Sequence, residues 1–544
     1  MPKSLDETYK RILNEINNAN RVHAYRLLQC LAVAFRPLRV EELAEVLAFD
    51  LTTGEIPKLN ADWHWEDKKE AVLSACSSLV SVIISNGSRV VQFSHFSVKE
   101  FLTSDRLASC REEVSRFHIP IEHSHTILAQ ACLGVLLCLD NRTDKDSVKN
   151  IPLYRYAAEF WVDHALVRNV ESQIKDALYY FFDIDNPHFS AMARIKFPHD
   201  LLTVTMDSDE EPANVLYSAA PLYFAAWVGL HGSVERLITK EPQQVNQLGG
   251  FYGTPLHASV LCGRIEISQL LITHGANVNS RCENNYTPLH VALDFRRLET
   301  VKWLLNHGAD VNPQDKDGWS PLHFAVNWNL EACRMLLEHN PEVDSRNNDG
   351  DTPFLRAWKR GRNPDILQLF LDHNADMNVC DNKGKTPLHF AAENGLLELA
   401  QTLLNRNADV NSQDKHGSTP LLLASELGHP DVVQLLLDHN ADLYLRDSDG
   451  DTPLHCAAFG GQLEVAQILL KLNVEVNSRN VKGSTPLHYA SKGWTRGSSV
   501  VVRLLLEYGA DVHMRDLSGM TASEVSRGPE QQEIIRLISK NVAE

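Results

Sequence analysis

The chain has 544 residues, 44% of them hydrophobic and 22% charged, and it carries a formal net charge of −18. This length accommodates two to four globular domains, and the acidic balance disfavours binding to duplex nucleic acid. No stretch of 18 apolar residues occurs and the charged N-terminus lacks an apolar signal segment, so we expect no membrane span and no secretory signal.

The ten cysteines are scattered along the chain, and none forms a C-x-x-C pair. Most of them stand in apolar helical contexts, as Cys30, Cys132 and Cys138 do. This usage is typical of small buried side chains in a reducing compartment. We therefore expect an intracellular, cytoplasmic protein, with the nucleus as the alternative location.

Residues 1–104 show an order of elements that is typical of a winged-helix domain. The apolar periodicity predicts helices at 4–16, 20–35, 39–47 and 66–77, followed by strands at 79–84 and 89–93. The Asn86-Gly87 pair between the two strands is a strong hairpin signal. The expected recognition helix, 66–77, mixes acidic and basic residues, so a packing role is favoured over DNA binding.

Residues 105–206 are predicted to form a helical spacer and a linker. Their early part contains a polar cluster of His118, Glu122, His123 and His125. A metal site would need a fixed geometry and a further ligand, so we interpret the cluster as a solvated helix start ahead of a buried run at 129–139. An acidic, proline-containing stretch at 207–212 marks the entry into the third region.

Residues 207–544 contain one short phrase in about ten copies, the last of them degenerate. Each copy is centred on a proline and recurs after 32 to 34 residues: Pro221, Pro255, Pro288, Pro321, Pro353, Pro387, Pro420, Pro453 and Pro486, with Thr521-Ala522 in the place of the tenth. Such a period is typical of a solenoid, in which each unit buries its apolar face only against its neighbours. The fold class that we expect is mainly α: an α-solenoid preceded by a winged-helix domain and a helical spacer.

The unit around Pro420 shows how one copy should fold. Gly417 allows a turn with positive φ, Thr419 suits a helix N-cap, and Pro420 then occupies the first helical position. This first helix should end near Gly428, and a second helix should follow at 431–439. Because first helices carry small residues and second helices carry large ones, stacked units should curve and leave one concave side.

Two phrases recur with little change in these copies, for example Thr386-Pro-Leu-His-Phe-Ala-Ala392 and His307-Gly-Ala-Asp-Val-Asn312. They resemble the ankyrin repeat, and the resemblance covers residues 215–544. It implies stacked pairs of helices that bind a protein partner on the concave face. Solenoids of this kind rarely host catalysis themselves.

A histidine follows the Pro-Leu pair in most units: His257, His290, His323, His389, His455 and His488. Zinc requires donor atoms about 2 Å from one ion, whereas helices of neighbouring units pack about 10 Å apart. We therefore expect each histidine to hydrogen-bond to the backbone within its own turn rather than to bind a metal ion.

Partner contacts are predicted two residues before each proline and six and seven residues after it. In the first half of the solenoid these positions hold Trp227, Tyr286, Phe295, Trp319, Asn327, Trp328, Lys359 and Arg360. Exposed Trp, Tyr and Arg are residue types that anchor interfaces. The alternative is that Trp328 and Trp358 fill gaps left by irregular units. One such unit, at Pro353, has Leu355 in place of the histidine.

Four phrases of the N-terminal region occur in one order, at residues 5–13, 36–44, 93–102 and 156–164. They are similar to stretches of fungal NACHT–ankyrin proteins, which belong to the STAND class of nucleotide-switched signalling ATPases. The resemblance implies a sensor and regulatory region of such a switch. The NACHT domain would precede residue 1, and the sequence contains no G-x-x-x-x-G-K-[ST] motif with which to hold phosphates.

The sequence also has no H-E-x-x-H, no G-x-S-x-G and no G-x-G-x-x-G between a strand and a helix. We therefore expect a protein that is not an enzyme and takes no cofactor or metal ion. The favoured hypothesis is an interaction and scaffold protein that binds a protein partner, not nucleic acid or membrane. The alternative is the sensor part of a STAND NTPase switch whose NACHT domain is missing from this chain.

Overall fold

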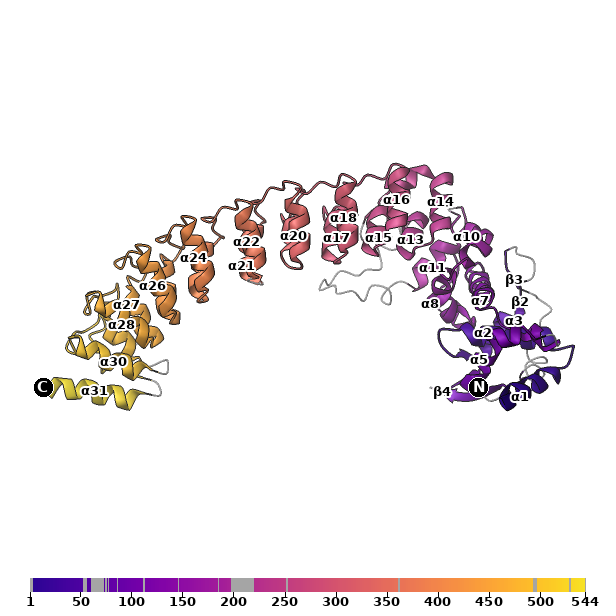
Figure 1. The fold of residues 1–544 in the computed structure, drawn as a ribbon, viewed down its shortest axis with the longest axis horizontal. Coiled ribbons are helices and arrows are strands. Elements are labelled where there is room, and N and C mark those ends of the chain that lie inside the picture. The colour runs from indigo at the N-terminus through magenta and orange to yellow at the C-terminus, as the bar shows by residue number, and fades with distance from the viewer. Residues whose placement is uncertain are drawn as a thin grey trace. The chain divides into compact units, whose positions relative to one another are not determined.

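The computed structural model describes residues 3–51, 56–59, 73, 76, 78–85, 87–110, 113–144, 146–183, 185–196, 220–250, 253–360, 363–492, 497–527 and 530–543. The chain divides into two compact units, Met1–His307 and Gly308–Glu544. Helices make up nearly all of the regular structure in both units, as the ribbon shows (Figure 1).

The first unit begins with a winged-helix arrangement. Its elements are α1 (Lys3–Asn14), α2 (Arg21–Val33), β1 (Leu38–Arg39), α3 (Val40–Ala48), β2 (Phe49–Asp50), β3 (Lys58–Leu59), β4 (Val80–Ser85), β5 (Ser88–Phe93) and α5 (Phe96–Leu102). The predicted hairpin is confirmed, because β4 and β5 pair antiparallel with Val82 opposite Val91. Gly87 supplies the positive φ, 76°, that the turn between them requires. Of the helix predicted at 66–77, the structure describes only Leu73 and Cys76.

The sheet of this domain has a third strand that the sequence did not predict. β1 pairs with β5, with Leu38 opposite Val91, so the strand order is β1-β5-β4. Pro37 cannot donate a backbone hydrogen bond and prevents the preceding helix from continuing. The fully buried Leu38 then seats the extended segment in the core, and α3 follows directly.

The spacer that follows is helical, as predicted. Its elements are α6 (Asp105–Ala108), η1 (Glu113–Phe117), α7 (Ile121–Leu136), η2 (Ser147–Asn150), α8 (Tyr154–Ala165), α9 (Val170–Gln173), α10 (Lys175–Phe181) and α11 (His188–Lys196). The prediction of a solvated helix start is wrong for His125, which is buried with its Nδ1 2.7 Å from Nδ1 of His164. Burial lowers the pKa of His164 to about 3, so this ring stays neutral.

An aromatic cluster connects the spacer helices to the first repeat helix, α13 (Pro221–Val228). The ring of Phe224 lies 6.2 Å from that of Trp161 and 5.3 Å from that of Phe189. Phe181 and Phe182 complete the cluster, and all five residues are buried, with at most 5% of the surface of any one exposed. Such pairs contribute about 1 kcal/mol each beyond the area that they bury, so the first repeat shares its core with the spacer.

Pairs of helices follow at the predicted period, and the solenoid prediction is confirmed. In the first unit they are α13 with α14 (His231–Lys240), α15 (Pro255–Leu261) with α16 (Ile265–Thr273), and α17 (Pro288–Asp294) with α18 (Leu298–Asn306); the short η3 (Pro242–Asn246) follows α14.

In the second unit the pairs are α19 (Pro321–Ala325) with α20 (Leu330–Leu337), α21 (Pro353–Arg360) with α22 (Pro364–Asp372), α23 (Pro387–Glu393) with α24 (Leu397–Asn405), α25 (Pro420–Leu427) with α26 (Pro430–Asp438), α27 (Pro453–Gly460) with α28 (Leu463–Lys471), and α29 (Pro486–Ser491) with α30 (Ser498–Glu507). The degenerate tenth copy forms turns at 522–525, and α31 (Gln531–Ala543) follows.

Each of the nine repeat prolines is the first residue of a first helix, where its missing N–H costs no hydrogen bond. Gly428, with φ of 79°, ends α25 as predicted, while α26 begins and ends one residue earlier than the predicted 431–439. Within the second unit, first helices contact first helices and second helices contact second helices. The repeats therefore form two layers, and the first helices make one continuous face.

The glycine in the loop before α25, Gly417, tests this stacking. Gly417 has φ of 71°, and a Cβ there would lie 3.1 Å from the backbone nitrogen of Ser448 in the next loop. We expect Gly417→Ala to lower the free energy of unfolding by about 2–3 kcal/mol, of which about 1 kcal/mol is the cost of the left-handed backbone. The measurement is urea denaturation followed by circular dichroism.

Gly509→Ala is the matched control for this prediction. Gly509 has φ of 83°, but a Cβ there meets nothing within 4 Å. We therefore expect only the backbone cost of about 1 kcal/mol. Equal losses in the two variants would contradict the close approach between neighbouring loops.

Candidate protein-binding surface

Six of the nine proline-led repeats begin their first helix with the same hydrogen-bonded turn. In the unit at Pro387, the backbone nitrogen of Thr386 donates to Nδ1 of His389 at 3.1 Å, and Thr386 Oγ1 lies 2.8 Å from the same atom. This is a capping box in which histidine replaces the usual glutamate. The same box is formed by His257, His290, His323, His455 and His488. The predicted bond within the turn is therefore confirmed.

The other ring nitrogen makes a bond that sequence reasoning missed. Nε2 of His389 donates to the carbonyl oxygen of Ser418, in the loop of the following repeat, at 2.9 Å. The same bond joins His257 to Tyr286 (3.0 Å), His323 to Asp351 (3.0 Å), His455 to Ser484 (3.1 Å) and His488 to Met520 (3.1 Å). The acceptor stands two residues before the next repeat proline or its replacement, so the histidine holds one of the positions at which partner contacts were predicted.

Burial keeps these histidines neutral. His323 and His455 are fully buried, and the loss of water lowers the pKa of each ring to about 4, although the bond to the carbonyl opposes the shift. Because Nε2 donates, Nδ1 accepts from a backbone N–H, and a proton added there would set two donors against each other. Both ring nitrogens are occupied, which leaves no lone pair for a metal ion. Among the residues that the structure describes, no three His, Cys, Asp or Glu side chains converge as a metal site requires.

A second turn shapes the loops before the first helices of the second unit. In this turn Asp381 Oδ1 accepts from the backbone nitrogens of Lys383 and Lys385 at 2.8 and 3.0 Å. The loop thereby holds the residue two before the proline beside the first helix. Lys385 occupies this position, and its Nζ lies 2.8 Å from Glu393 Oε2, six residues after Pro387.

Three positions of each repeat of the second unit share one face as a result: two residues before, three after and six after the proline. We call this the inner-helix face. Trp319, two before its proline, has its ring centroid 5.4 Å from that of Phe324, three after it. Lys359, six after its proline, places Nζ 5.7 Å from the ring centroid of Phe390 in the next repeat. The face therefore runs without interruption from one repeat to the next.

Three of the predicted partner-binding residues belong to the first unit, and each is half-buried. Trp227 packs against a buried cluster of Ala220, Tyr223 and Ala258, so part of its indole belongs to the core. The ring of Tyr286 stacks on His290 at 5.7 Å. Phe295 stands directly after α17.

The second unit contains the other five. Trp319 and Trp328 are half-buried and Asn327 is exposed. The ring of Trp319 lies under the guanidinium of Arg356, whose Cζ is 4.5 Å from the ring centroid. The alternative that an irregular repeat uses a tryptophan as filling holds for Trp358, which is 1% exposed.

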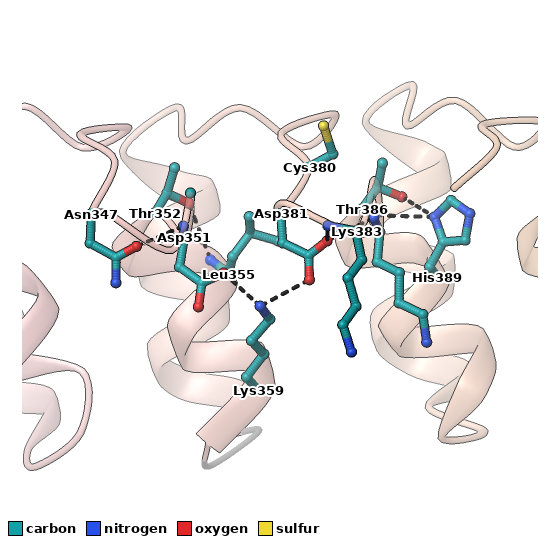
Figure 2. A network of polar contacts seen from close by, with 12 residues as sticks. Asn347, Asp351, Thr352, Leu355, Lys359, Cys380, Asp381, Lys383, Thr386 and His389 are labelled. Carbon is teal, nitrogen blue, oxygen red and sulfur yellow. Dashed lines mark hydrogen bonds and ion pairs between the residues drawn. The ribbon is translucent and has the colours of Figure 1, made fainter. Parts of the chain in front are cut away.

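Lys359 joins two repeats through its ammonium group (Figure 2). Its Nζ lies 2.6 Å from Asp351 Oδ1 in its own repeat and 2.9 Å from Asp381 Oδ2 in the next. The two carboxylate side chains are 4% exposed and that of Lys359 is 30% exposed. Burial opposes the charged ammonium, but the bonds to both carboxylates outweigh it and raise the pKa of Lys359. Arg360 ends α21, and its side chain lies outside the described residues.

The position three residues after the proline was missed in the sequence. In the second unit it holds Phe324, Arg356, Phe390, Leu423, Cys456 and Tyr489. Lys492 stands over the ring of Tyr489 at 4.5 Å, much as Arg356 stands over Trp319. Aligning the repeats on their prolines would have revealed this row of mainly large side chains, because a residue three along a helix returns to the same face as the residue six along.

The arrangement of helices agrees with comparisons to known proteins. The family pattern for ankyrin repeats in three copies matches residues 222–315, 311–379, 354–447 and 440–516, which together exceed half of the chain. The pattern for the winged helix domain of GPI inositol-deacylase matches residues 13–112. The two patterns fall on the repeat region and on the predicted winged-helix region.

One relative is the azaphilone pigments biosynthesis cluster protein L of Monascus ruber, 29% identical over 293 residues. The match spans 51% of this chain and 60% of the length of that relative. Among solved structures, the crystal structure of the ankyrin repeat domain of Bcl-3, a unique member of the IkappaB protein family, is 31% identical. The alignment covers 40% of this chain and 98% of the Bcl-3 chain, with a TM-score of 0.36.

Of the helices that the structure describes, none combines the length and the apolar character that a bilayer crossing requires.

The neutral histidines predict that stability depends on pH. The pKa of His455 is about 4 in the folded chain and 6.5 in its ordinary state, so the unfolded chain takes up the proton first as the pH falls. The contribution of the ring is complete above pH 6.5 and is lost between 6.5 and 4. We expect about 2 kcal/mol of this loss by pH 5.

His455→Leu isolates this contribution, since leucine occupies the same position naturally at Leu355 and Leu422. At pH 7.5 the variant should be less stable than the wild type, because two hydrogen bonds are lost. At pH 5 the difference should shrink by about 2 kcal/mol. Urea denaturation at the two pH values measures it, and an unchanged difference would rule out the neutral, buried ring.

The Lys359 bridge gives a prediction of its own. Lys359→Met leaves two nearly buried carboxylates without their cation. Because the lysine is partly exposed, we expect a loss of about 2 kcal/mol rather than the larger cost of breaking a fully buried pair. Lys482→Met is the control: this lysine and Asp449 are 62% and 57% exposed, so its loss should stay below about 0.5 kcal/mol. Similar denaturation midpoints for the two variants would contradict the bridging role.

Proposed function

Because the chain belongs to the ankyrin-repeat family, we propose that it is a scaffold that binds another protein on the inner-helix face of its repeats and catalyses no reaction. The observation that carries this proposal is the row of aromatic and cationic side chains on that face. The capping boxes and the core between helix layers do not account for these side chains. Trp319, Arg356 and Phe390 stand at consecutive repeats of this row.

The composition of the row favours a protein partner. Tryptophan, tyrosine and arginine contribute most to the binding free energy of an interface when their own chain buries them in part and the partner buries the remainder. Trp319 of this row and Trp328, which stands seven residues after its proline beside the row, meet this condition, since both are half-buried. An overall charge of −18 disfavours nucleic acid as the partner. We further propose that the protein acts in the cytoplasm.

The absence of catalysis is part of the proposal. The histidines that recur in the repeats use both ring nitrogens to hold the backbone, so they are unsuited to proton transfer. The sequence offers no phosphate-binding or nucleophile motif in their place.

A second candidate is the sensor part of a STAND NTPase switch. The combination of a winged-helix match at 13–112 with ankyrin repeats from 222 favours it, as does the similarity of the N-terminal phrases to NACHT–ankyrin proteins. In that case the same face would bind the signal, and a nucleotide-binding domain would come from sequence outside the 544 residues. An upstream reading frame that encodes G-x-x-x-x-G-K-[ST] would decide for this candidate.

A double substitution tests the interaction surface. We expect Trp319→Ala with Trp328→Ala to weaken capture of the partner at least tenfold, since each removes an anchor worth about 1–2 kcal/mol. The full chain serves as bait in an extract of its source cells, and quantitative mass spectrometry identifies and measures the captured proteins.

The control for this experiment is Tyr444→Ala with Tyr508→Ala. These tyrosines are 72% and 45% exposed, and neither stands on the inner-helix face. Capture should match the wild type, and the denaturation midpoints of both double variants show whether they fold. Unchanged capture by the tryptophan variant would remove this part of the face from the proposed surface.

A further inference from the structure

One loop position, six residues before the repeat proline, distinguishes two repeats from the others of the second unit. Most repeats carry an aspartate there: Asp315, Asp381, Asp414, Asp447 and Asp516 stand in this turn. Asn347 and Asn480 replace it in the units at Pro353 and Pro486. Asparagine keeps the acceptor oxygen that shapes the turn and adds an amide donor that aspartate lacks.

The amide donor of Asn480 is satisfied inside the chain. Its Nδ2 donates to Asp451 Oδ1 at 2.8 Å and to the hydroxyl oxygen of Tyr489 at 3.0 Å. That hydroxyl in turn donates to Asp451 Oδ2 at 2.8 Å. Asp451 therefore supplies a carboxylate that two donors of the next repeat hold in place.

The equivalent place beside Asn347 has no carboxylate. Trp319 stands two residues before its proline, as Asp451 does, and Arg356 stands three residues after its proline, as Tyr489 does. The two are in contact, with Arg356 Cζ 4.5 Å from the ring centroid of Trp319. The repeat at Pro353 thus keeps two hydrogen-bond donors, Asn347 and Arg356. The preceding repeat has the indole of Trp319 at the position where Asp451 supplies the acceptor.

Asn347 itself is 5% exposed, and its Oδ1 accepts from the backbone nitrogen of Asp351 at 2.9 Å. Its Nδ2 has no hydrogen-bond partner among the described residues. Figure 2 shows this nitrogen pointing away from Asp351, with no partner among the residues drawn. Leaving a buried amide donor unpaired costs about 1–3 kcal/mol. An acceptor that hydrogen-bonds to this nitrogen would remove that cost and so gain binding free energy.

We propose that this place receives the carboxylate of an Asp or Glu side chain of the protein partner, bound by Arg356 and Asn347 beside the ring of Trp319. This inference rests on the proposed function and names the chemistry of one anchor. Arg356 is half-buried at the surface and makes the first contact.

The charges around the place permit an incoming acid. Asp351 is neutralised by Lys359 at 2.6 Å. Asp315 Oδ1 accepts from the backbone nitrogens of Asp317 and Trp319 at 2.9 and 2.7 Å, so this carboxylate is committed to its own loop. A guanidinium and an amide together bind a carboxylate with charge-assisted hydrogen bonds, which are stronger than neutral ones.

The test uses a phage-displayed library of random twelve-residue peptides selected on the folded, full chain. We expect selected peptides to share one Asp or Glu next to an apolar residue, enriched about tenfold over the starting library. Trp319→Asp recreates the internal acceptor of the Asp451 repeat. This variant should unfold at higher urea concentration than the wild type and should lose the preference for an acidic residue.

Arg356→Gln should also reduce the acidic preference, whereas Lys492→Gln, which removes a cation over Tyr489 instead, should leave it intact. Selected peptides without a fixed acidic position would overturn the inference, as would a preference that survives in Trp319→Asp. If peptides without an acidic position still required Trp319 and Trp328 for binding, the proposed binding function would be supported and the carboxylate site at Arg356 and Asn347 would be ruled out. Loss of all selection by the wild-type chain would count against both.

Discussion

In five repeats the histidine at the start of the first helix uses both of its ring nitrogens, and the stacking of each repeat on the next depends on these bonds. Nδ1 accepts from the backbone that begins the helix, while Nε2 donates to a carbonyl oxygen of the next loop, as between His389 and Ser418. A side chain in the interior of one repeat therefore fixes the backbone of its neighbour. Burial in turn keeps the ring neutral, which is the only state in which both bonds can form.

Three of the nine proline-led repeats have another residue in place of this histidine, namely Tyr223, Leu355 and Leu422, and one of them compensates by other means. With Leu355 in its place, the repeat at Pro353 uses Lys359 to join Asp351 to Asp381 of the next loop. A side chain predicted to contact the partner thereby takes part in holding the fold. The same few positions serve both stability and partner recognition. The loop residue that the preceding repeat holds is the one two before the proline, and it also stands on the inner-helix face.

The sequence predicts this fold well because the repeat signal is local. The proline at the first helical position, the threonine before it and the glycine or asparagine in the turns each act within one repeat. The bonds between repeats are harder to predict, since they depend on the register in which neighbours stack. Trp319 and Arg356 are 37 positions apart in the sequence, and only the packed structure brings the guanidinium over the ring. His125 shows the same limit in the spacer, where a polar pattern indicated solvent and the partner His164 lies in another helix.

Each of these histidines reaches only the loop that follows, 28 residues along the chain for His323 and 29 for His389 and His455. A contact pattern of this range is preserved when a whole copy is gained or lost by unequal recombination, because the new neighbours present the same carbonyl. The number of copies can therefore change over evolution without the redesign of distant contacts. Single positions such as Asn347 and Trp319 can then change, because the bonds of the remaining copies hold the backbone in place.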